Sequence, residues 1–175
     1  MSINTNVCFR RAFVRTLVTL CGLLAATAFA LEAPTGRPIL TISGAINVKN
    51  AGPVVRFDMK MIESLPQHSF TTRTPWFDKP MKFTGPLLAD VLAAVGANGS
   101  TLEATAINDY TVTIPMADVL ARKVIMARLI DGQPIPVREK GPLFVVYPFD
   151  SDVTLRTSTF YERSIWQLKS LDVRP

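Results

Sequence analysis

The chain has 175 residues, a formal net charge of +5 and a hydrophobic content of 48%. Three of its nineteen basic residues and none of its fourteen acidic residues lie in residues 1–30, which leaves a net charge of only +2 for residues 31–175. This small charge gives no support to nucleic-acid binding. The length from residue 31 onward is typical of one compact domain with a single core.

The first thirty residues have the three parts of a secretory signal peptide. Arg10, Arg11 and Arg15 supply positive charge, residues 17–29 form a short apolar run, and residues 28–30 form a small-x-small cleavage site. The run is shorter than the roughly 20 residues that span a bilayer, so cleavage is favoured over a retained anchor. We therefore expect a signal peptide over residues 1–30, an exported domain over residues 31–175 and a periplasmic location.

The export route has two alternatives. Residues 10–15 resemble the twin-arginine signal, in which two arginines precede a bulky apolar pair and a basic residue, although Phe9 stands where that pattern prefers Ser or Thr. In the general secretory route the same arginines are an ordinary charged region. The sequence leaves both routes open.

Strands dominate the predicted elements. Apolar alternation and short apolar runs predict strands over residues 39–46, 54–57, 69–74, 81–83, 102–107, 111–114, 124–130 and 143–147. Asp131-Gly132 predicts a tight turn, and the continuous apolar run 143–147 predicts a buried central strand. In the closing strand, from Trp166 onward, apolar and polar residues first alternate, and the alternation then shifts by one position. This shift predicts a bulge near Lys169-Ser170.

Three short helices are predicted between these strands. Asp58 is a suitable cap for a helix over residues 59–64 that ends before Pro66. A second helix is predicted to start at Pro86 and to stop at Gly96, with an apolar face that lies on the core. A third covers residues 115–120. Many short strands with a few helices predict an α+β domain with mixed β-sheets.

The inventory of reactive side chains excludes several classes of site. Both cysteines, Cys8 and Cys21, lie in the predicted signal peptide, and His68 is the only histidine. The common zinc, haem and iron–sulfur sites need more of these ligands than residues 31–175 contain. Because no nucleophile-elbow pattern surrounds a serine, we interpret His68 as a histidine of a surface loop.

Three groups of residues follow one another in a characteristic order. The first comprises residues 72–76 and 83–92, the second residues 106–115, and the third residues 131–136, 141–148 and 164–171. Together they resemble the oxidoreductase molybdopterin-binding domain family, and in particular its small exported single-domain members. The resemblance implies a sulfite-oxidase-like α+β fold with mixed β-sheets and a few short helices, and it names molybdopterin as the family's cofactor.

One departure from the family pattern concerns the metal ligand. In catalytic members a cysteine a few residues before the tryptophan gives its sulfur to molybdenum, and here Thr72, Arg73 and Thr74 precede Trp76. A thiolate is a soft, readily ionised ligand, whereas a threonine hydroxyl is hard and stays protonated near neutral pH. We therefore predict no metal ligand in this protein, and molybdopterin is implied by the resemblance alone.

The resemblance also implies a ligand pocket between two loops. Its predicted lining residues are Thr72, Arg73, Thr74 and Trp76 on one loop and Asn108, Asp109 and Tyr110 on the other. Arg73 would pair with an anionic group, Trp76 and Tyr110 would contact a flat apolar group, and Asn108 would orient the ligand by hydrogen bonds.

Three functions remain open from the sequence. The leading hypothesis is a non-catalytic module that binds a small anionic or pterin-like ligand. The alternative is an enzyme, a small molybdopterin-dependent oxidoreductase of the periplasm whose metal is held by the cofactor alone. The third is a sensory accessory domain of a membrane partner such as a sensor kinase or cyclase, which rests on analogy. No nucleic-acid partner is expected.

Overall fold

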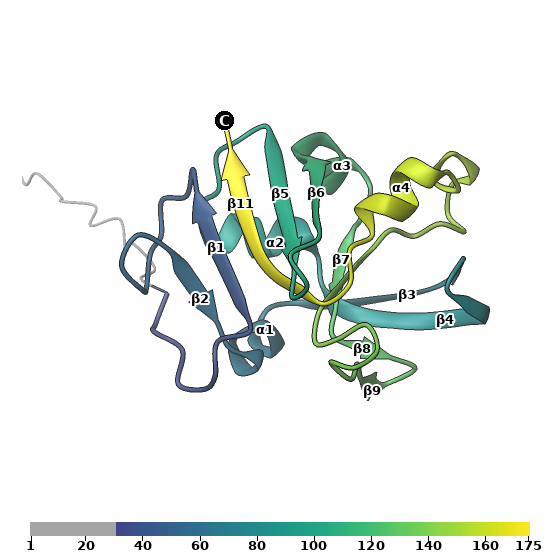
Figure 1. The fold of residues 1–175 in the computed structure, drawn as a ribbon, viewed down its shortest axis with the longest axis horizontal. Coiled ribbons are helices and arrows are strands. Elements are labelled where there is room, and N and C mark those ends of the chain that lie inside the picture. The colour runs from purple at the N-terminus through teal and green to yellow at the C-terminus, as the bar shows by residue number, and fades with distance from the viewer. Residues whose placement is uncertain (1–30) are drawn as a thin grey trace, which may run out of the picture.

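The computed structural model describes residues 31–175. The predicted signal peptide over residues 1–30, with its cleavage site, lies outside the described residues. Five strands form the larger sheet. Figure 1 shows this sheet on one side of the molecule and a long hairpin with smaller strands on the other, with the short helices between and beside them. No helix within residues 31–175 is long and apolar enough to cross a membrane.

The larger sheet joins the beginning and the end of the described chain. Its strands, in spatial order, are β2 (Val55–Phe57), β1 (Leu40–Gly44), β11 (Leu168–Arg174), β5 (Thr101–Ala106) and β6 (Thr111–Pro115). β1 and β11 run parallel, and the other neighbours are antiparallel. The register of β11 against β5 shifts between Leu168 and Ser170, which confirms the predicted bulge.

The remaining strands form two smaller sheets. The four-stranded sheet has the order β3 (Gln67–Thr74), β4 (Phe77–Pro86), β8 (Leu129–Ile130) and β9 (Gln133–Pro134), and the two-stranded sheet pairs β10 (Phe144–Val146) with β7 (Ile125–Ala127). Asp131 and Gly132 both have positive φ, 48° and 79°, which confirms the tight turn. β10 is fully buried as predicted, but its one strand neighbour among the described residues is β7.

The predicted strand over residues 124–130 is wrong as a single element. The strand is interrupted at Arg128, whose N–H donates to the carbonyl of Thr84. As a result, β7 pairs with β10, while β8 pairs with β4. The hairpin of β3 and β4 is also longer than predicted. β4 covers ten residues in place of the three predicted, because β3 supplies hydrogen-bonding partners along most of its length.

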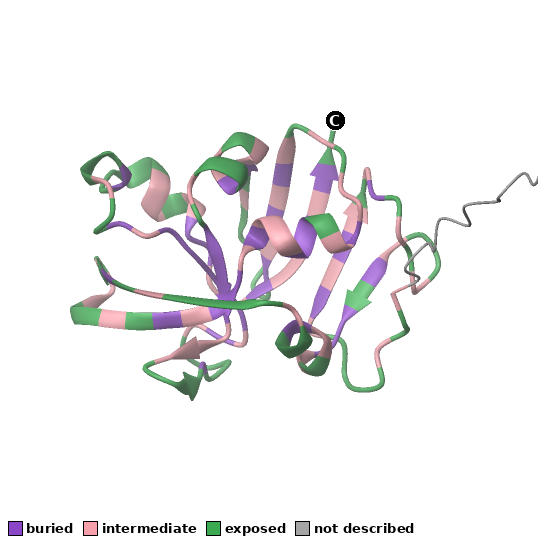
Figure 2. Cartoon of the chain, turned by 180° about the vertical axis from the view of Figure 1, so that it is seen from behind, coloured by how far each residue is buried: buried purple, intermediate pink, exposed green. Residues whose placement is uncertain are grey.

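Within residues 31–175, four α-helices accompany the sheets: α1 (Met59–Ser64), α2 (Leu88–Ala94), α3 (Met116–Ala121) and α4 (Ser158–Arg163), with a 3-10 helix over Val153–Leu155. α2 lies on the rear face of the five-stranded sheet (Figure 2), as its apolar face predicts. Asp58 caps α1 as expected, since its carboxylate accepts from the N–H groups of Met61 at 2.9 Å and Gly36 at 2.7 Å. These backbone donors lower the pKa of Asp58.

Two helix predictions need correction. Pro86 is the last residue of β4, so α2 begins two residues later at Leu88, whose N–H donates to the carbonyl of Val124. Gly96 follows the helix with a positive φ of 60°, as a helix-terminating glycine does. α4 was not predicted, because it has no side-chain cap and its apolar residues are the aromatic Phe160 and Tyr161.

Candidate functional site

An aromatic cluster lies where β10, α4 and the β3–β4 hairpin meet, and Trp76 is at its centre. Its ring centroid lies 5.5 Å from those of Phe144 and Trp166, 6.1 Å from Tyr161 and 6.3 Å from Phe149. All four contacts are edge-to-face, which is the arrangement that the ring quadrupoles favour. The cluster therefore holds the short turn between β3 and β4 against the rest of the molecule.

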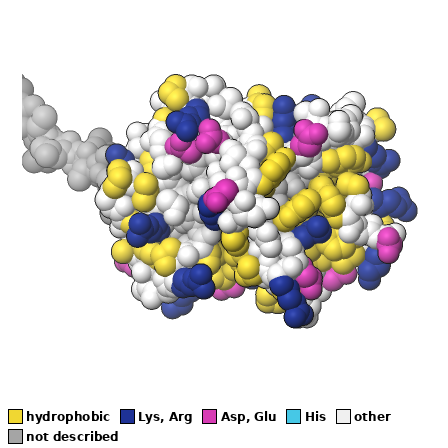
Figure 3. Space-filling view, viewed as in Figure 1, with side chains coloured by type: hydrophobic (Ala, Val, Ile, Leu, Met, Phe, Trp, Pro, Cys, Tyr) yellow, Lys and Arg dark blue, Asp and Glu magenta, His cyan; other side chains and the backbone are white. Residues whose placement is uncertain are grey.

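A cavity of about 380 Å³ opens beside this cluster. It is lined by Trp76, Ala106, Asn108, Tyr110, Tyr161, Glu162, Ser164, Ile165 and Trp166. Hydrophobic side chains gather on the same half of the molecule in Figure 3, around α4 and the β3–β4 hairpin. The lining is mostly apolar and aromatic with a few polar groups, as in small-molecule sites, and its one charged residue is Glu162.

The structure brings together three of the seven predicted site residues. Trp76 from the β3–β4 turn meets Asn108 and Tyr110 from the β5–β6 turn across the cavity. The amide oxygen of Asn108 accepts from the N–H of Tyr110 at 3.2 Å, which shapes the turn. Asp109 is absent from the lining, and its carboxylate forms a close ion pair with Lys169.

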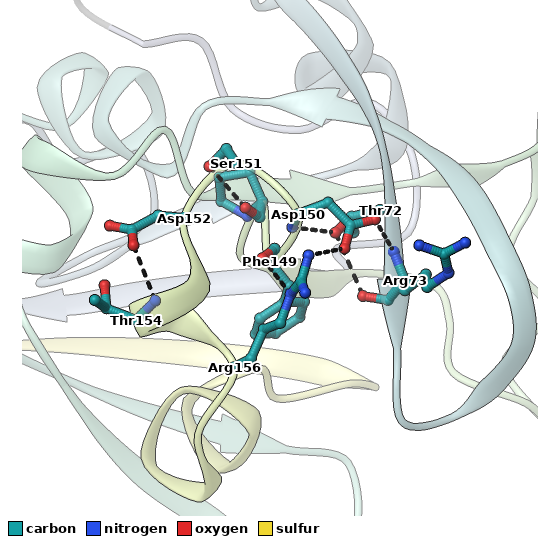
Figure 4. A network of polar contacts seen from close by, with 9 residues as sticks. Thr72, Arg73, Phe149, Asp150, Ser151, Asp152, Thr154 and Arg156 are labelled. Atoms are coloured by element: carbon teal, nitrogen blue, oxygen red, sulfur yellow. Dashed lines mark hydrogen bonds and ion pairs between the residues drawn. The ribbon is translucent and has the colours of Figure 1, made fainter.

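Thr72, Arg73 and Thr74 belong to strand β3, which confirms the strand predicted over residues 69–74 and corrects the loop that the family resemblance implied. Thr72 is fully buried, and its hydroxyl accepts from the N–H of Asp150 at 2.9 Å and donates to the carbonyl of Arg73 at 3.3 Å. Asp150 in turn accepts from the N–H of Arg73 at 2.8 Å and from the guanidinium of Arg156 at 2.7 Å. Figure 4 shows these groups converging on the loop after β10.

This polar network borders a second, smaller hollow of about 230 Å³. It is lined by Arg73, Thr74, Pro75, Asp150, Arg156 and Tyr161. Arg156 is held by Asp150 and by the carbonyl of Phe149 at 3.1 Å, whereas the guanidinium of Arg73 forms no ion pair within residues 31–175. Tyr161 lines both the hollow and the aromatic cavity, so the two spaces are neighbours.

Lys140 lies against the tryptophans of the cavity. Its ammonium group is 4.0 Å from the ring centroid of Trp166, 5.7 Å from that of Trp76 and 5.9 Å from that of Phe77. Partial burial lowers the pKa of Lys140, while the aromatic faces favour its charged form. The cavity thus has a cation against two of its aromatic walls.

α4 is anchored to α3 by charged and aromatic groups. The carboxylate of Asp118 accepts from Arg163 at 2.7 Å and from the hydroxyl of Tyr147 at 3.3 Å, and both Arg122 and Arg163 lie over the ring of Phe160. Burial, reinforced by Asp118, raises the pKa of Tyr147 above its ordinary value, so this phenol stays a hydrogen-bond donor at neutral pH.

Several residues of the site were missed from the sequence. Tyr161 and Trp166 form a wall of the cavity, and Lys140 supports it. The available signal was the concentration of aromatic residues between Phe160 and Trp166 beside an otherwise polar segment. His68, interpreted as a loop residue, is half-exposed in β3, with its ring 3.6 Å from the carboxylate of Asp90.

A molybdenum centre held by a protein sulfur does not fit these residues. Residues 31–175 contain no cysteine. Thr72, in the neighbourhood where the family pattern has the ligand, is fully buried with its hydroxyl committed to two backbone groups. Within the described residues, no group of three or more His, Cys, Asp or Glu side chains could hold a metal ion.

The fold and the sequence identify the family. The family model described as the oxidoreductase molybdopterin binding domain matches residues 40–150, and the chain belongs to this family. The match ends before α4, so Tyr161 and Trp166 lie beyond it.

A solved structure supports the same fold. The chain is similar to the sulfane dehydrogenase SoxCD from Paracoccus pantotrophus, with a TM-score of 0.58 and 16% identity over 77% of this chain. The match covers 37% of that chain, so this protein spans little more than a third of the length of its structural relative. The α+β, sulfite-oxidase-like fold is thereby confirmed. No curated protein matches the sequence.

Proposed function

We propose that this protein is an exported, non-catalytic member of its family that binds a small flat ligand in the aromatic cavity. The main support for this proposal is the contrast between Thr72 and Trp76. Thr72, near the position of the family's metal ligand, is buried within a hydrogen-bond network, whereas Trp76, only four residues later, lines an open cavity. The cavity supports recognition of a ligand, and the cysteine that binds the metal in catalytic members has no counterpart in residues 31–175.

The geometry also defines the kind of ligand. The volume of the cavity, about 380 Å³, suits a ring system of one or two fused rings, and the faces of Trp76, Tyr161 and Trp166 offer flat apolar contact. An anionic group on the ligand would reach past Tyr161 toward Arg73 in the neighbouring hollow. A pterin-like ring with a carboxylate or phosphate therefore meets both requirements.

The first experiment is direct binding of a defined probe. Both tryptophans of the chain line the cavity, so intrinsic fluorescence reports its occupancy. We expect 6-carboxypterin to quench this fluorescence saturably and uncharged pterin to bind more weakly. Arg73→Met should weaken only the carboxylated probe, with Arg138→Met as the matched surface control. If Arg73→Met affected both probes equally, the assignment of Arg73 to the anionic group would be wrong.

The second experiment tests the exclusion of the metal ligand. Thr72→Cys places a thiol in the network, and Tyr110→Cys places one at the cavity, where Tyr110 is 48% exposed. We expect a maleimide to label Tyr110→Cys at least about a hundredfold faster, because Thr72 becomes accessible only after local opening. Peptide-resolved mass spectrometry separates these sites from Cys8 and Cys21. Comparable labelling would show that position 72 is open to a cofactor.

The enzyme alternative is separated by metal analysis of the protein purified from its exported compartment. Stoichiometric molybdenum in that material would overturn the binding-module proposal and favour an oxidoreductase whose metal is held by the cofactor alone. Sequencing of the N-terminus of the same material tests the proposed export, since cleavage after Ala30 would leave Leu31 as the first residue.

A further inference from the structure

The outer edge of β3 has no strand neighbour within residues 31–175. β3 is eight residues long, and Figure 2 shows it as a long, mostly exposed strand on the near side of the molecule. Natural proteins usually protect such an edge with lysine, proline or a bulge, because unpaired backbone groups attract further strands. Between Gln67 and Arg73 the strand contains neither lysine nor proline, and the register irregularity of its pairing with β4 lies at its end, between Thr72 and Thr74.

The hydrogen bonds of β4 determine which groups of β3 point outward. Lys82 uses both backbone groups toward β8, since its carbonyl accepts from the N–H of Asp131 at 2.8 Å and its N–H donates to the Asp131 carboxylate at 2.9 Å. Backbone groups of consecutive strand residues point to opposite sides. Phe83 therefore faces β3, where its partner is Phe70.

Ser69 and Thr71 consequently direct their N–H and C=O groups away from β4. Arg73 has the same parity, and its N–H does point outward, because it donates to Asp150 at 2.8 Å. No comparable bond to the backbone of Ser69 or Thr71 occurs within the described part of the chain. The edge is thus closed at Arg73 by Asp150, and it is open at Ser69 and Thr71.

We propose that this open edge binds an extended, acidic peptide segment of a partner protein by β-strand addition. The solvent-facing side of the hairpin carries Arg73 and Lys82, and Lys82 lies directly across from Thr71. Neither cation has an ion pair within residues 31–175, whereas the nearby Asp150 is neutralised by Arg156. Acidic side chains of an added strand would therefore meet two free cations.

The other side of the edge offers an apolar contact. Phe70 is half-buried, its ring lies 6.4 Å from that of Phe83, and its side chain is on the face opposite to Thr71. An added strand that alternates acidic and apolar residues would match both faces. A second copy of β3 contains no acidic residue, so pairing of β3 with itself would leave Arg73 and Lys82 without an anionic partner.

The test uses a synthetic peptide that alternates valine and glutamate, acetylated and amidated at its ends. Amide hydrogen exchange measured by NMR should show slower exchange of the Ser69 and Thr71 amides when the peptide is bound, by at least about tenfold. The amides of Phe70, which faces β4, and Arg73, which is bound to Asp150, should not change. These two amides are internal controls in the same protein.

Two further comparisons isolate the backbone pairing. A peptide N-methylated at alternate residues should bind at least about tenfold more weakly, and so should a peptide with lysine in place of glutamate. Thr71→Pro, which removes the outward N–H, should weaken binding while Thr71→Val preserves it. The N-methylated peptide needs no protein variant, so this comparison still tests the proposal if Thr71→Pro fails to fold.

Two outcomes would overturn this proposal. Equal binding of the N-methylated and unmodified peptides would show that the backbone edge is not the site. A concentration-dependent dimer in sedimentation, with Ser69 and Thr71 protected in the absence of peptide, would assign the edge to a second copy of the chain. The proposal does not depend on ligand binding in the aromatic cavity, because it rests on the backbone edge at Ser69 and Thr71. Arg73 is common to both proposals, so the peptide experiment is carried out without a pterin probe.

Discussion

The aromatic cavity and the polar network at Thr72 lie next to each other, but they differ in how their side chains pack and in how much space they leave open. Around Trp76, large rings meet edge-to-face and leave about 380 Å³ open beside them. Around Thr72, the buried hydroxyl and the neighbouring backbone groups bond to one another, and no buried side-chain nitrogen or oxygen within the described residues lacks a hydrogen bond. The difference separates a region that can receive a ligand from one that serves the stability of the fold.

The largest expected effect concerns the cavity. Trp76→Ala removes the ring that contacts Phe144, Phe149, Tyr161 and Trp166, so we expect the free energy of unfolding to fall by about 3 kcal/mol. Binding of 6-carboxypterin, followed by calorimetry, should be lost as well. Urea unfolding measures the stability.

Trp76→Phe is the matched control for this variant, because it keeps an aromatic ring at the same position. It should retain most of the stability and weaken the probe only moderately. If Trp76→Ala unfolded at the same urea concentration as the unmodified protein, the cluster would not be what holds the β3–β4 turn.

A smaller effect is expected in the polar network. Thr72→Val keeps the shape of the side chain but removes the hydroxyl that bonds Asp150 and Arg73. Because the N–H of Asp150 then loses its partner in a partly buried setting, we expect a loss of about 1–3 kcal/mol in urea unfolding. Probe affinity in the cavity should stay unchanged, and a parallel loss of affinity would mean that the two regions are coupled.

The anchoring of α4 gives the next effect. Tyr147→Phe removes one hydrogen bond to Asp118 but leaves the ion pair of Asp118 with Arg163, so we expect a loss of about 1 kcal/mol. Asp118→Ala should cost more, since it leaves both Arg163 and Tyr147 without their acceptor. The ratio of these two effects, measured by thermal unfolding, tests whether the ion pair is what positions the α4 wall of the cavity.

Local chemistry was readable from the sequence. The cap at Asp58, the turn at Asp131-Gly132 and the bulge near Lys169-Ser170 each depend on residues close together in the chain, and each was predicted. The break at Arg128 was missed, because it depends on an acceptor in β4, more than forty residues away. Sheet membership is set by such distant pairing, which apolar patterning does not encode.

The structure brings only part of the predicted site together. Trp76, Asn108 and Tyr110 do converge, since the residues of both turns line the same cavity. Thr72, Arg73 and Thr74 could not all face one pocket once they were found in a strand. The alternation of residues 69–74 had already predicted a strand, and a strand sends Thr72 inward and Arg73 outward, which is incompatible with the loop that the resemblance implied.

The smallest expected effect concerns Lys140, where a favourable contact with an aromatic ring and an unfavourable burial of charge oppose each other. Contact of the ammonium with Trp166 at 4.0 Å stabilises the charged side chain, while its partial burial penalises the charge and lowers its pKa. Lys140→Met keeps the apolar stem and removes both contributions, so we expect the free energy of unfolding to change by less than about 1 kcal/mol.

Lys79→Met, at a side chain that is 74% exposed, is the matched control. Tryptophan emission should change in Lys140→Met alone, because only Lys140 touches an indole ring. A loss well above 1 kcal/mol in urea unfolding would show instead that the cation holds Trp166 in place and is part of the cavity wall.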